Sequence, residues 1–272
     1  HLVEIIPCVT SNAEMLDNLE RFLVTTLGKG VIRAKDTPNF VANRVGVFSM
    51  LATIANAEKY GVRFDVVDDL TGPRLGRPKS ATFRTADVVG LDTFAHVVKT
   101  MQDTLPEDPW HPLFKTPDWL ARLIADGALG QKTRRGIYKK EGKQTFVLDP
   151  LKGEYVEGGQ KGDEAVKAIL KEADPAVKFK KLRESQHPQA QFLWACFRDV
   201  FHYISYHLAD IADNARDLDL AIRWGFGWST GPFETWQSAG WQQVAQWLEQ
   251  DIEAGQAMGK AALPAWVTDS NR

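Results

Sequence analysis

Lys35–Ile54, which reads KDTPNFVANRVGVFSMLATI, predicts the central helix of the fold. Pro38 favours an extended Thr37 and suits the first turn of a helix, so we expect Thr37 to be the N-cap. Apolar side chains then recur at helical spacing on two opposite faces, one with Val47, Met50 and Ile54 and the other with Val41, Val45, Phe48 and Ala52. A helix that is apolar on both faces is expected to be central and buried.

Asn43 interrupts the first of these two faces with a polar amide. We expect this amide to be buried, and a buried amide costs about 1–3 kcal/mol unless it is hydrogen-bonded. Its partner is either the backbone or a bound ligand, and the helix pattern alone leaves both open.

The composition excludes several classes of partner. The chain has 272 residues, a formal net charge of −2 and two cysteines. Such a charge gives no basic footprint for nucleic acid, and no apolar run is long enough to span a membrane. Cys8 and Cys196 lie far apart without metal-ligand spacing, which is typical of free thiols in a reducing cytosol. We therefore expect a cytoplasmic protein without a nucleic-acid, membrane or metal partner.

The N-terminal stretch predicts a strand, a helix and a second strand. Leu2–Val9 is short, apolar and β-branched, and Pro7 interrupts it. Glu4 within such a strand lies either at a sheet edge or in a functional site. Ser11–Glu14 has the spacing of a capping box, so a helix is expected from there to about Leu27, before a strand at Val31–Ala34.

Two later stretches are polar. Gly127–Lys140, GALGQKTRRGIYKK, is a glycine-punctuated basic loop whose charges are most simply interpreted as solvated, and it leads into a strand. Gly142 allows a hairpin into Gln144–Leu148. Lys152–Gln189 is charged and weakly patterned, which favours a linker with one or two surface helices, and a second long buried helix follows from Gln191.

A tandem repeat organises the chain. Four pairs of landmarks share an offset of 150 residues: Asp69 and Asp219, Phe83 and Phe233, Thr85 and Thr235, and Gly90 and Gly240. This predicts one arrangement used twice: a long helix, a short helix, a glycine turn and a helix. The same offset places Leu193 opposite Asn43. Because the second copy has no amide there, we infer a ligand-binding role for Asn43.

These motifs together resemble a known family. They are the LVE strand with Glu4, TPNFVANR, GRPKSATFRTADVVGLD, GQKTRRGIYKKEG and GFGWSTGPFE. The chain resembles the C-terminal helical region of bacterial 3-hydroxyacyl-CoA dehydrogenases of fatty-acid β-oxidation, of the type fused to enoyl-CoA hydratase. This implies a mainly α fold of tandem helical repeats like the C-terminal domain of 6-phosphogluconate dehydrogenase, with a short N-terminal strand left from a Rossmann domain and a small β-hairpin.

The resemblance also implies four parts along the chain. Residues 1–34 would be the edge of the Rossmann domain with a connecting helix, and residues 35–148 the first helical dehydrogenase domain. Residues 149–190 would be a linker, and residues 191–272 the second helical repeat. The start at His1 rather than Met is interpreted as the start of a piece of a longer protein.

Site roles follow from the resemblance, residue by residue. Glu4 corresponds to the glutamate of the family's catalytic His–Glu pair, and the histidine would precede His1. Asn43 corresponds to the asparagine that binds the substrate oxygen near the thioester. Lys132 corresponds to a lysine that reaches the NAD cofactor. NAD belongs to the complete enzyme, and none is expected on this chain alone, which contains no GxGxxG motif.

The resemblance predicts that the complete enzyme oxidises L-3-hydroxyacyl-CoA to 3-ketoacyl-CoA, and that this chain alone is inactive. Its expected partners are the acyl-CoA substrate and the N-terminal Rossmann domain, and the bare N-terminal strand allows a homodimer. Two alternatives stay open: another dehydrogenase of the same helical architecture, and a helical scaffold that only oligomerises.

Overall fold

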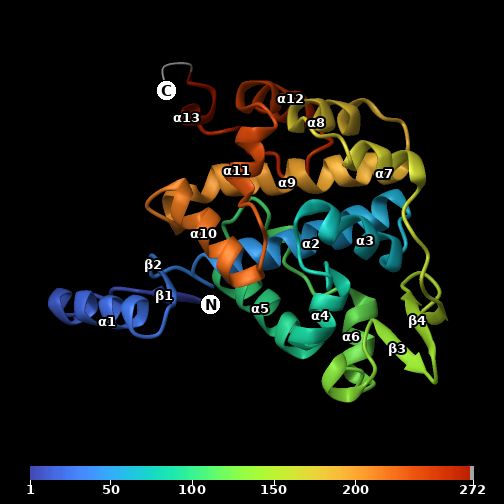
Figure 1. The fold of residues 1–272 in the computed structure, drawn as a ribbon, viewed down its shortest axis with the longest axis horizontal. Coiled ribbons are helices and arrows are strands. Elements are labelled where there is room, and N and C mark those ends of the chain that lie inside the picture. The colour runs from blue at the N-terminus through green and yellow to red at the C-terminus, as the bar shows by residue number, and fades with distance from the viewer. Residues whose placement is uncertain (270–272) are drawn as a thin grey trace. The chain divides into compact units, whose positions relative to one another are not determined.

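The computed structural model describes residues 1–269, and its contacts divide the chain into two compact units (Figure 1). The first unit comprises His1–Phe48 and the chain from Arg198 onward, and the second comprises Ser49–Phe197. Two long helices, α2 (Ala42–Tyr60) and α9 (Pro188–Ile211), contribute residues to both units. The division into four parts given above stays a prediction.

The first unit begins with a strand, a helix and a second strand, as expected, and the two strands pair in parallel. These are β1 (Leu2–Ile5), α1 (Ala13–Thr25) and β2 (Gly30–Arg33). Glu4 pairs in register with Ile32. The first strand is shorter than expected because it ends before Pro7, which has no N–H for a ladder. The N-cap of α1 is Asn12, whose side chain accepts a hydrogen bond from the Met15 amide at 3.0 Å.

The central helix is confirmed, but its start is not where the sequence suggested. Residues 38–41 form turns, and Asn39 and Phe40 have φ of 62° and 52°. Left-handed residues cannot continue a right-handed helix. The prediction that Thr37 caps the helix is therefore wrong, and α2 begins at Ala42. The apolar residues of both predicted faces are buried: Val41, Val45, Val47, Phe48, Met50, Ala52 and Ile54.

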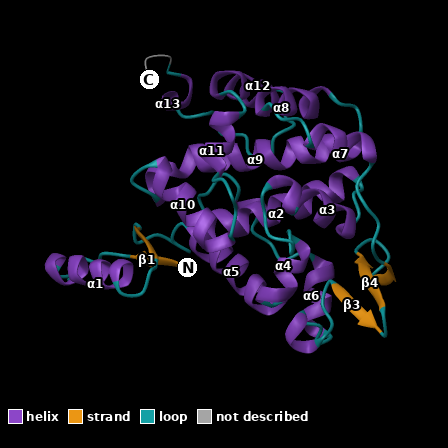
Figure 2. Ribbon diagram, in the orientation of Figure 1, coloured by secondary structure: helices purple, strands orange, loops and turns teal. Residues whose placement is uncertain are grey.

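The remainder of the first unit is helical (Figure 2). It consists of the end of α9 followed by α10 (Ala215–Phe226), α11 (Pro232–Ser238), α12 (Trp241–Glu253) and α13 (Ala265–Thr268). Aromatic rings fill its core: Trp236 is fully buried, stacks on Trp241 at 4.1 Å between ring centroids and lies 5.3 Å from Phe201. Within the described residues, no helix combines the length and apolar character needed to span a bilayer.

Gly46 allows α10 to approach α2 within the first unit. A Cβ atom at this position would lie 2.0 Å from the Phe226 ring. In an exposed helix, Gly→Ala usually stabilises by about 1 kcal/mol. We predict the opposite for Gly46→Ala, a loss of about 2 kcal/mol in the free energy of unfolding, because the ring must move. Urea denaturation measures this, and an unchanged or raised stability would contradict the packing described.

The second unit combines helices with a small antiparallel sheet. Its elements are α3 (Phe64–Thr71), α4 (Phe83–Val89), α5 (Leu91–Thr104), α6 (Asp118–Ala125), β3 (Tyr138–Glu141), β4 (Gln144–Asp149), β5 (Glu154–Glu157), α7 (Glu164–Leu170) and α8 (Pro175–Glu184). The predicted hairpin is present as β3–β4. The sequence did not predict β5, which adds a third strand within the expected linker, where Val147 pairs with Val156.

The two copies of the repeated pattern use the same local device. Asp68 accepts hydrogen bonds from the amides of Thr82, Phe83 and Arg84 at the start of α4, at 2.7–3.0 Å. Asp219 likewise accepts from the amides of two residues at the start of α11, Phe233 at 2.8 Å and Glu234 at 2.9 Å. Each buried carboxylate thus satisfies N–H groups that a helix start leaves unpaired.

This geometry corrects one pair of landmarks. The residue that plays the part of Asp219 is Asp68, whereas Asp69 accepts from the Gly162 amide and lies near Lys161. The aspartates are therefore 151 residues apart, while Phe83 and Phe233 keep the offset of 150. The second copy therefore has one residue fewer between the carboxylate and the helix that it caps, 14 positions from Asp219 to Phe233 against 15 from Asp68 to Phe83.

Burial raises the pKa of Asp219 to about 7, although the Phe233 and Glu234 amides oppose the rise. Between pH 4 and pH 7 the folded protein therefore binds more protons here than the unfolded chain, so this residue's contribution to stability falls as pH rises through that range. We predict that wild type loses about 1 kcal/mol or more of stability from pH 5 to pH 8 relative to Asp219→Asn. Denaturation experiments in which the free energies of unfolding of wild type and Asp219→Asn change equally with pH would contradict this.

Candidate functional site

Glu4 is fixed at the start of the central helix. It lies on β1, and its Oε1 atom accepts hydrogen bonds from the amides of Val41 at 2.9 Å and Ala42 at 3.1 Å. The first amides of a helix have no partner within the helix, and the positive end of the helix dipole favours a carboxylate there. The strand glutamate therefore takes the place expected for Thr37, with its orientation set by two backbone donors.

The turn before α2 aims these amides at Glu4. Asn39 and Phe40 both lie in the left-handed region, which is unfavourable for a bulky side chain such as that of Phe40. The Phe40 amide closes the turn on the Thr37 carbonyl at 3.0 Å. The Thr37 hydroxyl is buried without a hydrogen-bond partner in the part of the chain that is described. Backbone strain and an unpaired buried hydroxyl in one turn are typical of functional sites.

Asn43 lies on the first turn of α2, directly after the amides that hold Glu4. Its side chain is exposed, so the prediction of a buried amide is wrong. The buried apolar stripe begins one turn later, at Val47, although Ala42 and Arg44 on either side of Asn43 are buried. No hydrogen bond involves this side chain within residues 1–269. The structure thus brings Glu4 and Asn43 to one helix start, with the Asn43 amide accessible to a ligand.

Lys132 belongs to the second unit, on a single 3₁₀ turn, Gln131–Thr133. Its Nζ atom donates to both oxygens of Asp92, at 2.6 and 2.7 Å. The Lys132 ammonium holds the pKa of Asp92 below its usual value. Both side chains are nearly half exposed, at 48% and 42%, so the pair contributes little to stability and leaves the ammonium accessible.

Asp87 on α4 holds the loop that carries Lys132, and sequence reasoning missed it. Its oxygens accept hydrogen bonds from the amides of Ile137 at 2.8 Å and Tyr138 at 2.9 Å. A Cβ atom at Gly130 or Gly136 would lie 2.3 Å or 2.1 Å from Asp87 atoms, so only glycine allows this approach. Burial raises the pKa of Asp87 to about 6. The one signal in the sequence was a carboxylate between the apolar residues Ala86 and Val88.

The comparisons with known proteins agree on a family. Residues 40–140 match the family model of the 3-hydroxyacyl-CoA dehydrogenase C-terminal domain. The chain is 40% identical over 268 residues to a probable 3-hydroxyacyl-CoA dehydrogenase of Bacillus subtilis (strain 168), covering 98% of this chain and 33% of that protein. Residues 40–140 are a 3-hydroxyacyl-CoA dehydrogenase C-terminal domain.

The relatives of this C-terminal domain include a mitochondrial hydroxyacyl-coenzyme A dehydrogenase of Rattus norvegicus, 32% identical over 138 residues, or 51% of this chain and 42% of that protein. The solved structure of 3-hydroxybutyryl-CoA dehydrogenase from Escherichia coli K12 substr. MG1655 superposes with a TM-score of 0.65 at 17% identity, covering 98% of this chain and 66% of that chain. This likeness shows a shared fold. The chain spans about a third of the length of the Bacillus subtilis protein.

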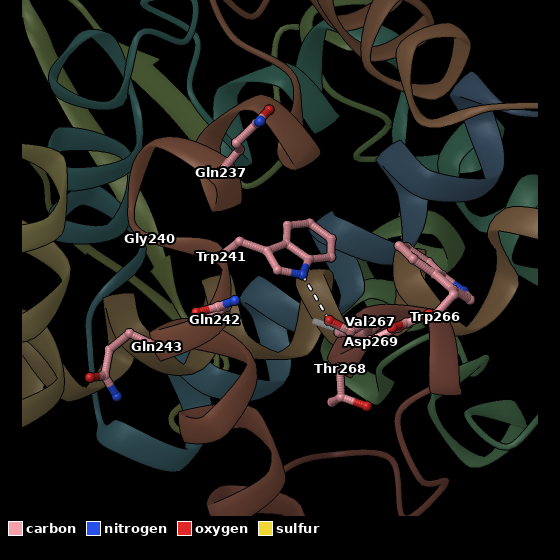
Figure 3. A pocket seen from close by; sticks show the side chains of 9 residues that line it. All are labelled: Gln237, Gly240, Trp241, Gln242, Gln243, Trp266, Val267, Thr268 and Asp269. Carbon is pink, nitrogen blue, oxygen red and sulfur yellow. Dashed lines mark hydrogen bonds between the residues drawn. The ribbon is translucent and has the colours of Figure 1, made fainter. Parts of the chain in front are cut away.

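A further pocket, of about 700 Å³, lies outside the matched C-terminal domain, within the first unit (Figure 3). It is lined by residues of α11–α13, among them Trp241, whose indole donates to the Val267 carbonyl at 2.8 Å, and Trp266. Its polar lining is mostly amides and one hydroxyl, with Asp269 as the single carboxylate. Such a lining offers no acid–base pair. We therefore place the candidate site at Glu4 and Asn43.

Proposed function

We propose that this chain is the helical part of an NAD-dependent L-3-hydroxyacyl-CoA dehydrogenase of fatty-acid β-oxidation, which oxidises 3-hydroxyacyl-CoA to 3-ketoacyl-CoA. One observation carries the proposal: a strand carboxylate, Glu4, held by two amides at the start of α2 beside the exposed amide of Asn43. The family match over residues 40–140 supports the same reaction class.

Glu4 acts as the positioning residue of the base. A carboxylate that accepts the N–H of an imidazole fixes its tautomer and stabilises its cation, so the histidine takes the proton of the 3-hydroxyl more readily. In this proposal the histidine comes from outside the chain. The amides of Val41 and Ala42 occupy one oxygen of Glu4, which leaves Oε2 for the imidazole. A bound NAD would supply the hydride acceptor in the complete enzyme.

Asn43 and Lys132 hold the two ligands. The Asn43 side chain donates its N–H to the substrate oxygen near the thioester, for which its exposed position on α2 is suitable. Lys132 contacts the cofactor from the Gln131–Thr133 turn. Its ion pair with Asp92 holds the ammonium in place until the cofactor binds, and this half-exposed pair can then be replaced by the contact with the cofactor. The residues present fit this role as contacts to NAD, whereas the dinucleotide-binding part of the site lies outside the chain.

The chain alone is expected to be inactive, since it supplies neither the histidine nor a dinucleotide-binding motif. Its partner in the complete enzyme is the Rossmann domain, its substrate is an acyl-CoA, and a cytoplasmic location is part of the proposal. A homodimer remains allowed through the free edges of β1 and β2.

A chimera tests the proposal. The matched region of the Bacillus subtilis relative is replaced by this chain, and NADH oxidation with acetoacetyl-CoA is followed by absorbance, with the isolated chain measured alongside. We expect turnover by the chimera and none by the chain alone. A folded chimera without turnover, or clear turnover by the isolated chain, would contradict the proposed division of roles.

A further inference from the structure

Arg84 has the opposite charge to the residue at the corresponding position of the second repeat. The residue 150 positions later is Glu234, whose carboxylate accepts from the Gly231 amide at 2.6 Å and pairs with Arg223 at 2.9 Å. Glu234 therefore caps the start of α11. Arg84 cannot accept a hydrogen bond, so α4 lacks this cap. The second repeat forms the corresponding helix start with glutamate, so this helix start does not require an arginine.

The Arg84 guanidinium lines a pocket of about 420 Å³ within the second unit. Arg134, Lys139 and Lys140 also line this pocket, together with Tyr138 and Thr145. Lys139 is paired with Glu141 at 2.6 Å. The other three cations, Arg84, Arg134 and Lys140, form no ion pair in the described part of the chain. Asp87 is a lining carboxylate, but both of its oxygens already accept backbone N–H groups.

Arg84 is held in place before any ligand binds. Its guanidinium lies 3.9 Å from the centroid of the Tyr138 ring, and the Tyr138 hydroxyl donates to Asp68 at 2.9 Å. This cation–π contact restrains the position of the guanidinium and leaves its N–H groups able to donate.

Arg134 is held at the cost of backbone strain. It has a φ of 59° in the left-handed region, and its amide closes a turn on the Gln131 carbonyl at 3.0 Å. Glycine is the residue that suits this backbone, and an arginine kept there indicates a use for its side chain.

We propose that this pocket, formed by Arg84, Arg134 and Lys140, binds the phosphate group of a small phosphorylated ligand. Arginine forks match the oxygens of phosphate in pairs, and a lysine adds a point charge. The phosphate belongs either to coenzyme A or to a free nucleotide. In the first case the site extends the proposed function and rests on it, as a contact for the far end of the acyl-CoA.

Isothermal titration of the chain with coenzyme A, dephospho-coenzyme A, ADP and inorganic phosphate tests this. The variants are Arg84→Gln and Arg134→Gly, with Lys143→Gln as a control. Lys143 is exposed in the β3–β4 turn and does not line the pocket. Arg134→Gly is the sharpest variant, because it relieves the strained backbone while it removes a cation. The midpoint of thermal unfolding of this variant should be unchanged or higher, so weaker binding could not be attributed to unfolding.

We expect saturable binding that weakens about tenfold in each arginine variant and less than about twofold in Lys143→Gln. Coenzyme A binding clearly tighter than dephospho-coenzyme A would assign the site to the 3′-phosphate, whereas tightest binding of ADP would assign it to a free nucleotide. Absence of saturable binding for all four probes up to about 5 mM, or affinities unchanged in both arginine variants, would overturn the phosphate site. Neither of these results would decide the proposed function, which is tested independently by turnover of the chimera.

Discussion

Glu4→Gln in the chimera is expected to lower kcat for acetoacetyl-CoA by about 100-fold or more. Glutamine keeps an oxygen that can accept from the Val41 and Ala42 amides, so the helix start should be preserved. What is lost is the negative charge that stabilises an imidazolium and selects its tautomer. The KM for the substrate should change little, because Glu4 acts through the histidine rather than on the acyl-CoA.

The pH profile separates this role from a structural one. In the reduction of acetoacetyl-CoA the histidine must be protonated, because it donates a proton to the forming hydroxyl. With the carboxylate gone, the pKa of the histidine falls, so the basic limb of the rate profile should move to lower pH. Glu14→Gln, at an exposed position in the first turn of α1, is the matched control and should leave rate and profile unchanged. A Glu4→Gln enzyme with normal kcat, or one whose loss is explained by a lowered unfolding midpoint, would contradict the positioning role.

Asp68→Ala is expected to be the most destabilising substitution in the second unit. The side chain is buried and accepts from three amides at the start of α4 and from the Tyr138 hydroxyl. Alanine would leave these donors without their acceptor, and each buried unpaired donor costs about 1–3 kcal/mol. Burial raises the pKa of Asp68 to about 6, because ionising a buried carboxyl group is unfavourable. Alanine removes this unfavourable term, which offsets part of the stability lost with the hydrogen bonds. We expect a net loss of about 4 kcal/mol in the free energy of unfolding.

The neighbouring Asp69 provides the comparison. It accepts from one amide, that of Gly162 at 3.0 Å, and lies near three cations. Arg74 and Lys161 are partly exposed, and the buried Lys167, 3.9 Å away, has a closer partner in Glu164 at 2.7 Å. Asp69→Ala should therefore cost about 1–2 kcal/mol in urea denaturation. If Asp69→Ala cost more than Asp68→Ala, the original pairing of Asp69 with Asp219 would be the better description of the repeat.

The fold was largely predictable because its signals are local. Apolar residues on two opposite faces identified α2, and Pro7 limited the first strand. The short strand β5 was missed because Glu154–Glu157 has only two apolar residues and is recruited by pairing with β4. Pairing between strands depends on tertiary contacts that a single segment does not encode.

The site was only partly predictable for a similar reason. The resemblance selected Glu4, Asn43 and Lys132, and the structure shows the surroundings of each. Thr37 failed as a cap because Glu4, 33 residues earlier in the chain, supplies the acceptor, and local capping rules do not include a distant strand. Asn43 is exposed although Ala42 and Arg44 on either side of it are buried, and helical periodicity alone could not indicate this local difference in burial.

The most direct test of the account is kcat/KM for acetoacetyl-CoA, compared between the chimera and its Asn43→Ala variant. The Asn43 side chain is exposed and forms no hydrogen bond within residues 1–269, and it follows the two amides that hold Glu4, the proposed positioning residue of the base. If Asn43 donates to the substrate oxygen, kcat/KM should fall about 10- to 100-fold while the unfolding midpoint stays unchanged. An active chimera in which Asn43→Ala retains full kcat/KM would contradict the placement of the substrate at the start of α2.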